Sequence, residues 1–376
     1  MSTWIPALHA GMTHRGGLPR LTEVPSGATF LTAMRRARRK RSAAAFSLVL
    51  SSLLWSAHAD SALAATDASV VAKAKAEGEV VLYTAWGLDA VQELQKVFAK
   101  KFPFIKLDVL RTGSERLLTI TIAEHKQNLF RADVFSGSHL AMINHKKLGH
   151  LQKYLSAEQP AFPKEYKDPD GYWTAFYMDT RVLAYNTRQL TRENAPKTYD
   201  DLLLPKWKGK MAMDDADYIM YGSLLEMMGR ERGLSFMKKL TQQDLIIRGG
   251  HPLLTQLLIG GEFPIYLDGF GSNIEKFKAQ GAPIDWVALE PVIVSLNPVG
   301  MAVNAPHPNS AKLLVDFLLS KEGQEVGRSV AKIPARPEVE PSYPRLTKGL
   351  KLFPVPLAVA DRYGEIVKEF REIFLK

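Results

Sequence analysis

Residues 80–110 read VVLYTAWGLDAVQELQKVFAKKFPFIKLDVL, and this stretch indicates an α/β fold. The apolar, β-branched run at 80–84 is typical of a buried strand. Apolar residues then recur at helical spacing over 91–102, with Asp89 placed to cap the helix, and a second apolar run follows at 105–110. A strand, a helix and a strand in this order form the unit of a parallel sheet.

The same alternation continues along the chain. A second α/β unit is expected over 211–289, after a polar connector that contains proline. The segment 172–185 is expected to form two successive strands, and 292–303 is expected to be a further extended segment. Amphipathic helices are expected at 310–319 and 360–374. We therefore predict parallel sheets with helices on both faces, in a chain long enough for two domains.

The front of the chain has the three-part order of a secretory signal. An uncharged, mostly apolar run at 43–55 is followed by small residues at 57–64 that fit an A-x-A cleavage site. The run is about a dozen residues, short of the roughly 20 that span a bilayer, so we expect 34–64 to be removed through the general secretory route. We interpret 1–33 as an over-extended start with Met34 as the initiator. The basic residues that precede the apolar run are Arg35, Arg36, Arg38, Arg39, Lys40 and Arg41.

Composition narrows the classes of function. The chain has 49 Lys and Arg residues, of which eight lie in residues 1–59, and 39 Asp and Glu residues, of which one lies there. The remainder of the chain therefore has 41 basic and 38 acidic residues. This balance gives no reason to expect a nucleic-acid partner. The chain has no cysteine, which excludes disulfides, thiolate metal sites, cysteine nucleophiles and a lipid-modified cysteine. We expect a soluble, exported protein without a lipid anchor, in a periplasm or outside the cell, and a monomer in the periplasm is our first choice.

Several phrases in a fixed order resemble the extracellular solute-binding proteins of ATP-driven importers. The resemblance is to the group that includes the ferric-ion-binding proteins, and it covers residues 80–333. It implies a type II periplasmic-binding-protein fold, in which two α/β lobes joined by a two-strand hinge close on a ligand in the cleft. The phrases are VVLYT (80–84), ADVF (132–135), RVLAYNT (181–187), PKWKGK (205–210), GEFP (261–264) and AKLLVDFLLSKEGQ (311–324).

The resemblance also implies how the chain is divided and which proteins it meets. Lobe 1 is expected to consist of 69–179 with 291–335, and lobe 2 of 180–290. Residues 336–376 are expected to form a helical segment that packs back on the lobes. The expected partners are a small-molecule ligand and an inner-membrane ABC permease that recognises the closed form.

One departure from the group concerns its cargo. Ferric-binding members coordinate iron with two adjacent tyrosines after the Gly-Glu-x-Pro strand, whereas residues 268–273 here read DGFGSN. The loop at 85–89 also lacks the histidine that some members carry. Ferric iron prefers phenolate and carboxylate oxygen, so bare iron is not the first choice of cargo. We predict no metal ligands and no cofactor.

Candidate ligand-binding residues of lobe 1 follow the expected strands. Ligands of open α/β sheets bind beyond the carboxyl ends of the strands, where helix N-termini favour negative charge and hydroxyl groups add donors. The same residues also suit helix caps, Arg111 suits a surface ion pair, and Trp86 suits the core. The candidates are Trp86, Arg111, Thr112, Gly113, Ser114, Ser136, Ser138 and His139.

Candidates of lobe 2 come from two helix starts. The acidic run at 214–218 lies where the resemblance implies a ligand-contacting helix, although carboxylates at a helix start also serve as caps. Two glycines at 249–250 precede a helix with proline in its first turn, which exposes backbone donors, although Gly-Gly is also an ordinary turn. The candidates are Asp215, Asp217, Tyr218, Arg248, Gly250, His251 and Asp268.

The mixture of cationic and acidic candidates favours a small polar or charged solute. An oxyanion-bearing or zwitterionic metabolite fits it better than a plain sugar. One alternative is a ferric-iron or iron-chelate carrier, and another is a periplasmic sensor partner of a membrane receptor. We expect no enzymatic activity, because the chain contains no H-E-x-x-H, no Gly-x-Ser-x-Gly and no phosphate loop.

Overall fold

The structure is a computed structural model that describes residues 68–375. The predicted signal at 34–64 and the predicted over-extended start lie outside the described residues. Within 68–375, no helix has the length and apolar character needed to cross a membrane. The elements alternate between strands and helices, which confirms the α/β class.

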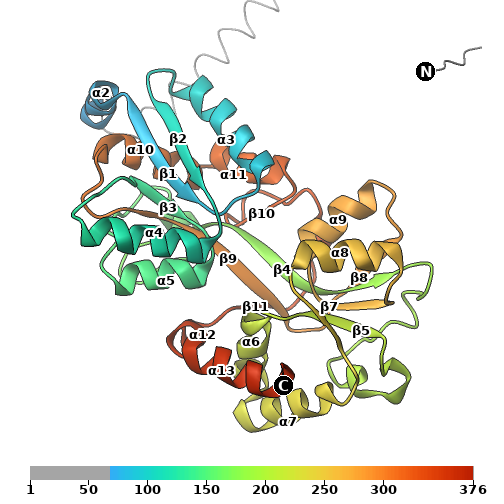
Figure 1. Cartoon of the computed structure of the whole chain (residues 1–376). Coiled ribbons are helices and arrows are strands. Elements are labelled where there is room, and N and C mark those ends of the chain that lie inside the picture. Colours follow the sequence, from blue (N-terminus) through green and yellow to red (C-terminus); the bar gives the residue numbers. More distant parts are fainter. Residues whose placement is uncertain (1–67, 376) are drawn as a thin grey trace, which may run out of the picture. The chain divides into compact units, whose positions relative to one another are not determined.

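Three parallel strands open the first sheet, in the order β2-β1-β3. Helices α4 and α5 pack together, and α2, α3, α10 and α11 form a second group in which α10 contacts α2 and α11 contacts α3 (Figure 1). We call this part lobe 1. Its strands are β1 (Glu79–Thr84), β2 (Lys106–Arg111) and β3 (Val134–Ser136), and its helices are α2 (Ala68–Glu77), α3 (Leu88–Lys101), α4 (Ser114–Lys126), α5 (His139–Lys147), α10 (Pro308–Leu319) and α11 (Lys321–Ser329).

Two long antiparallel strands connect this sheet to the rest of the molecule (Figure 1). They are β4 (Thr174–Asn186) and β9 (Val292–Met301). The first half of β4 pairs with β9, and its second half pairs with β7 and β8. The prediction of two successive strands at 172–185 is therefore wrong: the segment is one strand, because its residues find partners in both sheets. The prediction of parallel sheets is wrong here as well, since β9 is antiparallel to β3 and β4 to β7.

The second sheet continues in the order β4-β7-β5-β6, with β8 beside β4. We call this part lobe 2. Its strands are β5 (Met211–Asp214), β6 (Ile246–Arg248), β7 (Ile265–Phe270) and β8 (Ile284–Val287), and its helices are α6 (Tyr218–Met228), α7 (Arg230–Thr241), α8 (His251–Gly260) and α9 (Gly271–Ala279). The residue boundaries predicted for the two lobes stay predictions, since both lobes share β4 and β9.

The C-terminal segment returns to the junction of the lobes. Strand β11 (Leu352–Pro354) pairs with β9, and it is followed by α12 (Leu357–Asp361) and α13 (Tyr363–Phe374). The single helix predicted at 360–374 is thus two helices, separated at Arg362. Helix α13 packs on α6 through Phe370, whose ring meets that of Tyr221 edge to face.

Short elements complete the connections. Strand β10 (Ile333–Pro334) pairs with β4. Single turns of 3-10 helix lie at Gln159–Ala161, Lys164–Tyr166, Asp200–Leu203, Pro205–Trp207 and Pro344–Leu346.

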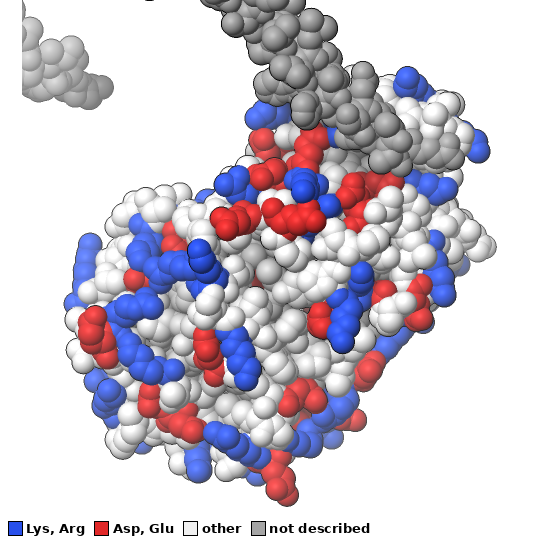
Figure 2. All heavy atoms as spheres, turned by 180° about the vertical axis from the view of Figure 1, so that it is seen from behind, with Lys and Arg blue, Asp and Glu red and all other residues white. Residues whose placement is uncertain are grey.

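Two large hydrophobic clusters and a small one around Leu140, Ile143 and Ala360 stabilise the described part of the chain. The larger one begins between the helices and strands of lobe 1 and continues along β4 to α8 and α9. The second fills the other face of the lobe 2 sheet, beneath α6, α7 and α13. Each fully buried large apolar side chain contributes about 1.5–3 kcal/mol. Charged residues of both signs are interspersed over the face shown in Figure 2, as the balanced composition leads one to expect.

Candidate functional site

A cavity of about 430 Å³ lies where α5 of lobe 1, α6 of lobe 2 and the C-terminal helices converge. Three predicted site residues line it: Ser138, His139 and Tyr218. The remaining lining residues are Glu115, Leu140, Ile143, Arg181, Ala216, Ile219, Phe270, Ser295, Leu296, Asn297, Val355, Pro356, Val359, Ala360 and Tyr363.

The N-terminus of α5 forms one wall. Ser138 caps this helix, its hydroxyl accepting from the amide of Ala141 at 3.3 Å. Its own amide donates to the hydroxyl of Ser114 at 3.1 Å, so Ser114 supports the wall from behind. His139 is buried against the edge of Trp173, with ring centroids 4.7 Å apart, and its Nε2 has no hydrogen-bond partner. Burial lowers the pKa of His139 to about 4, so the imidazole is neutral at ordinary pH.

Arg181 supplies the positive charge of the cavity. It lies on β4, and one terminal nitrogen donates to Oδ2 of Asp268 at 2.6 Å. Its Nε donates to the hydroxyl of Ser295 at 3.1 Å, and its guanidinium lies 4.1 Å from the ring centroid of Phe270. Sequence reasoning missed Arg181 as a site residue. The available signal was a cation directly before the apolar run 182–185, because a cation within a largely buried strand rarely occurs without a partner.

Behind Arg181, several polar side chains of lobe 2 form a buried group. Asp214 accepts from the amides of Ala216 at 2.9 Å and Gly250 at 2.6 Å. Asp217, the N-cap of α6, accepts from the amide of Asp214 at 3.0 Å. Burial and then the charge of Asp268 raise the pKa of Asp217 well above its usual range.

His251 closes this group at the start of α8. Its Nδ1 contacts the hydroxyl of Tyr266, and its Nε2 lies 3.6 Å from Oδ1 of Asp217. Burial and then the nearby Arg181 lower the pKa of His251. The ligand atoms of Asp214, Asp217 and His251 lie within 4.8 Å of one another, an arrangement that can hold a metal ion. The sequence analysis expected no metal ligands.

Two predicted residues are part of the core. Trp86 is 1% exposed, stacks on Phe176 at 4.6 Å and donates from Nε1 to the hydroxyl of Ser136 at 3.0 Å. The Ser136 hydroxyl in turn donates to the carbonyl of Pro298 at 2.8 Å. Trp86 is therefore not the aromatic wall of this cavity, because its ring is enclosed by lobe 1.

The other predicted residues lie outside the cavity lining. Arg111 and Gly113 are exposed, and the junction that contains Thr112 contributes Glu115 to the cavity instead. Asp215, Arg248 and Gly250 are also exposed, at the ends of β5 and β6. The side chain of Arg248 donates to the carbonyl of Ile247, and the amide of Asp215 donates to the carbonyl of Arg248.

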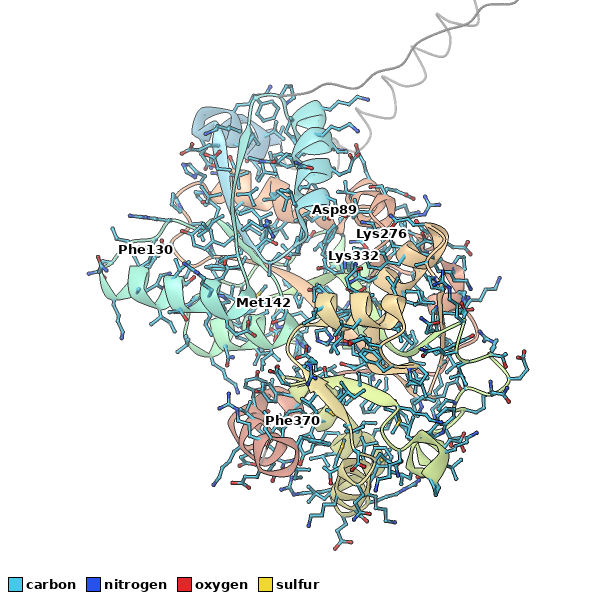
Figure 3. All side chains as sticks on the ribbon, turned by 45° about the vertical axis from the view of Figure 1, so that its right-hand side comes forward. Asp89, Phe130, Met142, Lys276, Lys332 and Phe370 are labelled. Atoms are coloured by element: carbon cyan, nitrogen blue, oxygen red, sulfur yellow. The ribbon has the colours of Figure 1, made fainter. Side chains whose placement is uncertain are left out.

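A second set of charges spans the two lobes on another side (Figure 3). Nζ of Lys276 on α9 lies 3.0 Å from Oδ2 of Asp89 on α3, and Nζ of Lys332 lies 3.1 Å from Oδ2 of Asp179. Although burial opposes the shift, Lys276 lowers the pKa of Asp89. The expectation that Asp89 caps α3 is wrong: the N-cap is Gly87, and Asp89 lies in the first turn, where its carboxylate accepts from the amide of Ala90.

A family model described as bacterial extracellular solute-binding protein matches residues 131–350. A relative, the Fe(3+)-binding periplasmic protein of Serratia marcescens, is 23% identical over 272 residues, which are 68% of this chain and 78% of that protein.

Two solved structures are also similar. Iron-bound HitA from Pseudomonas aeruginosa has a TM-score of 0.70 at 20% identity, over 78% of this chain and 99% of that one. The periplasmic binding protein AfuA from Actinobacillus pleuropneumoniae, with fructose-6-phosphate bound, has a TM-score of 0.68 at 24% identity, over 79% and 99%. At these identities the likeness establishes the fold, and it confirms the predicted type II periplasmic-binding-protein fold.

Proposed function

The chain belongs to the bacterial extracellular solute-binding proteins, and from this premise we propose that it binds a small organic solute carrying an oxyanion, or an oxyanion together with an ammonium group. Members of this family are the non-enzymatic solute-binding components of ABC importers. The proposed binding site is the cavity between α5, α6 and the C-terminal helices.

The size of the cavity supports an organic solute. Its volume of about 430 Å³ falls within the range of roughly 300–1,000 Å³ that is common for small-molecule sites. A bare metal ion fills only a small part of such a space. AfuA, with its bound fructose-6-phosphate, is an example of an organic oxyanion held on the same fold.

The polar groups of the lining support an anionic group on the solute. Helices α5 and α6 both begin at the cavity, and the first turn of a helix directs its free amides and the positive end of its dipole outward. Arg181 adds a guanidinium, and Ser138 and Asn297 add uncharged polar groups. This convergence of two helix starts on one buried cation is the observation that carries the proposal.

The remaining lining residues suit the rest of the molecule. Glu115 places a carboxylate in the lining, which favours an ammonium group at the other end of the solute. Ile143, Ile219 and Val359 form an apolar surface that suits a short carbon skeleton. A zwitterionic oxyanion, such as an aminoalkyl phosphonate, therefore satisfies all parts of the cavity at once.

The test is to identify the solute and then locate its site. Native mass spectrometry of the purified protein identifies what co-purifies, and titration calorimetry with that compound measures its affinity. We expect Arg181→Lys to weaken binding at least ten-fold, because a lysine loses the forked contacts of the guanidinium. Arg188→Lys, a change at an exposed arginine near the end of β4, is the matched control and leaves the affinity unchanged.

Arg248→Ala separates the cavity from the site predicted by sequence. Arg248 is exposed and absent from the cavity lining, so the cavity proposal expects no loss of affinity. A loss with Arg248→Ala and none with Arg181→Lys would move the site to the start of α8 and contradict the proposal.

Ferric iron remains a second candidate for one reason. Tyr218 and Tyr363 both line the cavity, with ring centroids 6.0 Å apart. Burial and then Glu115 raise the pKa of Tyr363 to about 12, which disfavours the phenolate that iron requires. We expect no coloured complex when Fe(III) is titrated in. A coloured Fe(III) complex that is lost in the Tyr363→Phe variant would mean that the protein binds iron and not an organic solute.

A further inference from the structure

We propose that Asp214, Asp217 and His251 bind a divalent transition-metal ion with the size and ligand preference of zinc. This site is in lobe 2, directly behind the wall of the cavity. The ring of His251 packs on that of Phe270, which lines the cavity, with centroids 4.7 Å apart. The ion is distinct from the solute, and the inference is independent of the proposed function.

The spacing of the donor atoms suits an ion better than a hydrogen bond. Nε2 of His251 and Oδ1 of Asp217 are 3.6 Å apart, which is too long for a hydrogen bond. Two ligands of a tetrahedral zinc, each about 2.1 Å from the ion, lie about 3.4 Å from one another. One carboxylate oxygen of Asp214 lies within 4.8 Å of a ligand atom of each of the other two residues. Zinc accepts both histidine nitrogen and aspartate oxygen, and three protein ligands leave the fourth position to a water.

An unpartnered oxygen points into the same space. Oδ1 of Asp217 is buried without a hydrogen-bond partner, and the residue is 2% exposed. An unsatisfied carboxylate oxygen at this depth is costly, so it indicates a missing cationic neighbour. The nearest permanent cation, Arg181, is already paired with Asp268.

Groups that hydrogen-bond to the three proposed ligands hold their side chains in place. Nδ1 of His251 faces the hydroxyl of Tyr266, which leaves Nε2 as the ring nitrogen for the ion. Oδ1 and Oδ2 of Asp214 accept from the amides of Ala216 and Gly250, and Oδ2 of Asp217 accepts from the amide of Asp214. Metal ligands are commonly oriented by such contacts. The side chain of His251 is 23% exposed, and it provides a route from solvent.

The charge of the group also favours a cation. Asp214, Asp217 and Asp268 are three buried carboxyl groups, and Asp268 is paired with the guanidinium of Arg181. A divalent ion neutralises the excess negative charge of these buried carboxyl groups.

The experiment is a metal titration of the purified protein without added solute. The protein is dialysed against a chelator, Co²⁺ is added while its visible absorption is followed, and Zn²⁺ is then used to displace it. We expect one ion per chain, with the intense absorption of a tetrahedral cobalt site. Asp217→Asn and His251→Gln are expected to weaken binding at least 100-fold, and Tyr266→Phe about 10-fold, as for an outer partner.

A second group of histidines provides the control. His125, His145 and His150 lie close together in lobe 1, and the two Nδ1 atoms of His145 and His150 are 3.1 Å apart. His150→Gln is expected to leave the cobalt spectrum and the Zn²⁺ affinity unchanged. Circular dichroism verifies that each variant is folded.

Either of two results would overturn the proposal. One is a protein that binds none of Zn²⁺, Co²⁺ and Mn²⁺ at millimolar concentration. The other is a cobalt spectrum that survives in folded Asp217→Asn and His251→Gln but disappears in His150→Gln. Neither result bears on solute binding in the cavity, which is measured separately.

Discussion

Arg181 is expected to contribute both to the stability of the fold and to solute binding. It is paired with Asp268 in a setting where both side chains are largely enclosed, and it also faces the cavity. Burying a charge costs free energy that only its partner offsets, so loss of either partner leaves an uncompensated charge.

We therefore predict that Arg181→Met lowers the free energy of unfolding by about 3–5 kcal/mol, because Asp268 is left buried without a cation. Urea unfolding followed by circular dichroism measures the change. Arg188→Met, at an exposed position just after β4, changes stability by no more than about 0.5 kcal/mol. A loss below about 1 kcal/mol for Arg181→Met would mean that Asp268 is neutralised in another way.

His145 and His150 make stability depend on pH. Burial and then the neighbouring histidines lower the pKa of His145 to about 3, and burial and then His125 lower that of His150 to about 4. In the unfolded chain both titrate near 6.5. The folded state therefore binds fewer protons than the unfolded state below about pH 6.5. Their contribution is complete above that pH and is lost as the pH falls through about 4.

The prediction is that the free energy of unfolding decreases between pH 7 and pH 4.5, by at most about 1.4 kcal/mol per pH unit for each titrating histidine. Urea unfolding at several pH values measures this slope. His145→Leu keeps the apolar packing on Phe135 and removes one titrating group, so its slope is shallower. An identical slope in both proteins would assign the pH dependence to the carboxylates.

Among the elements, the junction of α10 and α11 explains the phrase Ser-Lys-Glu-Gly-Gln in physical terms. Ser320 caps α11, its hydroxyl accepting from the amide of Gly323 at 3.2 Å. A Cβ at Gly323 would lie 1.9 Å from the carbonyl oxygen of Phe317 and 2.7 Å from Cα of Leu318. The two helices can approach this closely only with glycine at position 323.

Gly323→Ala is expected to lower the free energy of unfolding by at least about 1–3 kcal/mol, because the backbone of α10 must move. The matched control is Gly364→Ala in α13, where a Cβ meets no atom within 4 Å. That change is expected to raise stability by up to about 1 kcal/mol, because alanine favours a helix more than glycine does. Thermal unfolding of both variants measures the difference, and equal effects would refute the steric argument.

For the whole molecule, the ion pair between Asp89 and Lys276 connects α3 of lobe 1 to α9 of lobe 2 (Figure 3). Both side chains are about half exposed, so the pair contributes at most about 1 kcal/mol and is weakened by salt. Because the pair connects the two lobes, its loss is expected to act on lobe closure as well as on stability.

We predict that Lys276→Ala lowers the affinity for the solute by up to about five-fold, because the closed form alone loses this contact. The effect is expected to shrink at high ionic strength, which calorimetry in low and high salt measures. Lys278→Ala is the control, since Lys278 lies on the same helix but pairs with Asp285 within lobe 2 at 2.8 Å. Equal losses in the two variants would place the effect inside lobe 2.

The sequence by itself determined the order of strands and helices, the family and the loops that lie at the strand ends, because periodicity and turn residues are local properties. Of the binding residues predicted from the sequence, Ser138, His139 and Tyr218 line the cavity, and their role in binding stays a prediction. The prediction of two strands at 172–185 was wrong, because the single strand β4 is continued by partners in two sheets.

Only the tertiary structure decided which polar groups meet. Asp214 and Asp217 adjoin His251 because β5 and β6 end side by side, and Arg181 reaches Asp268 because β4 pairs with β7. The side chain of Trp86 packs in the core and does not line the cavity, because the direction of a side chain depends on the neighbours that enclose it. Such convergence arises from strand pairing over long separations, which residue spacing along the chain does not encode.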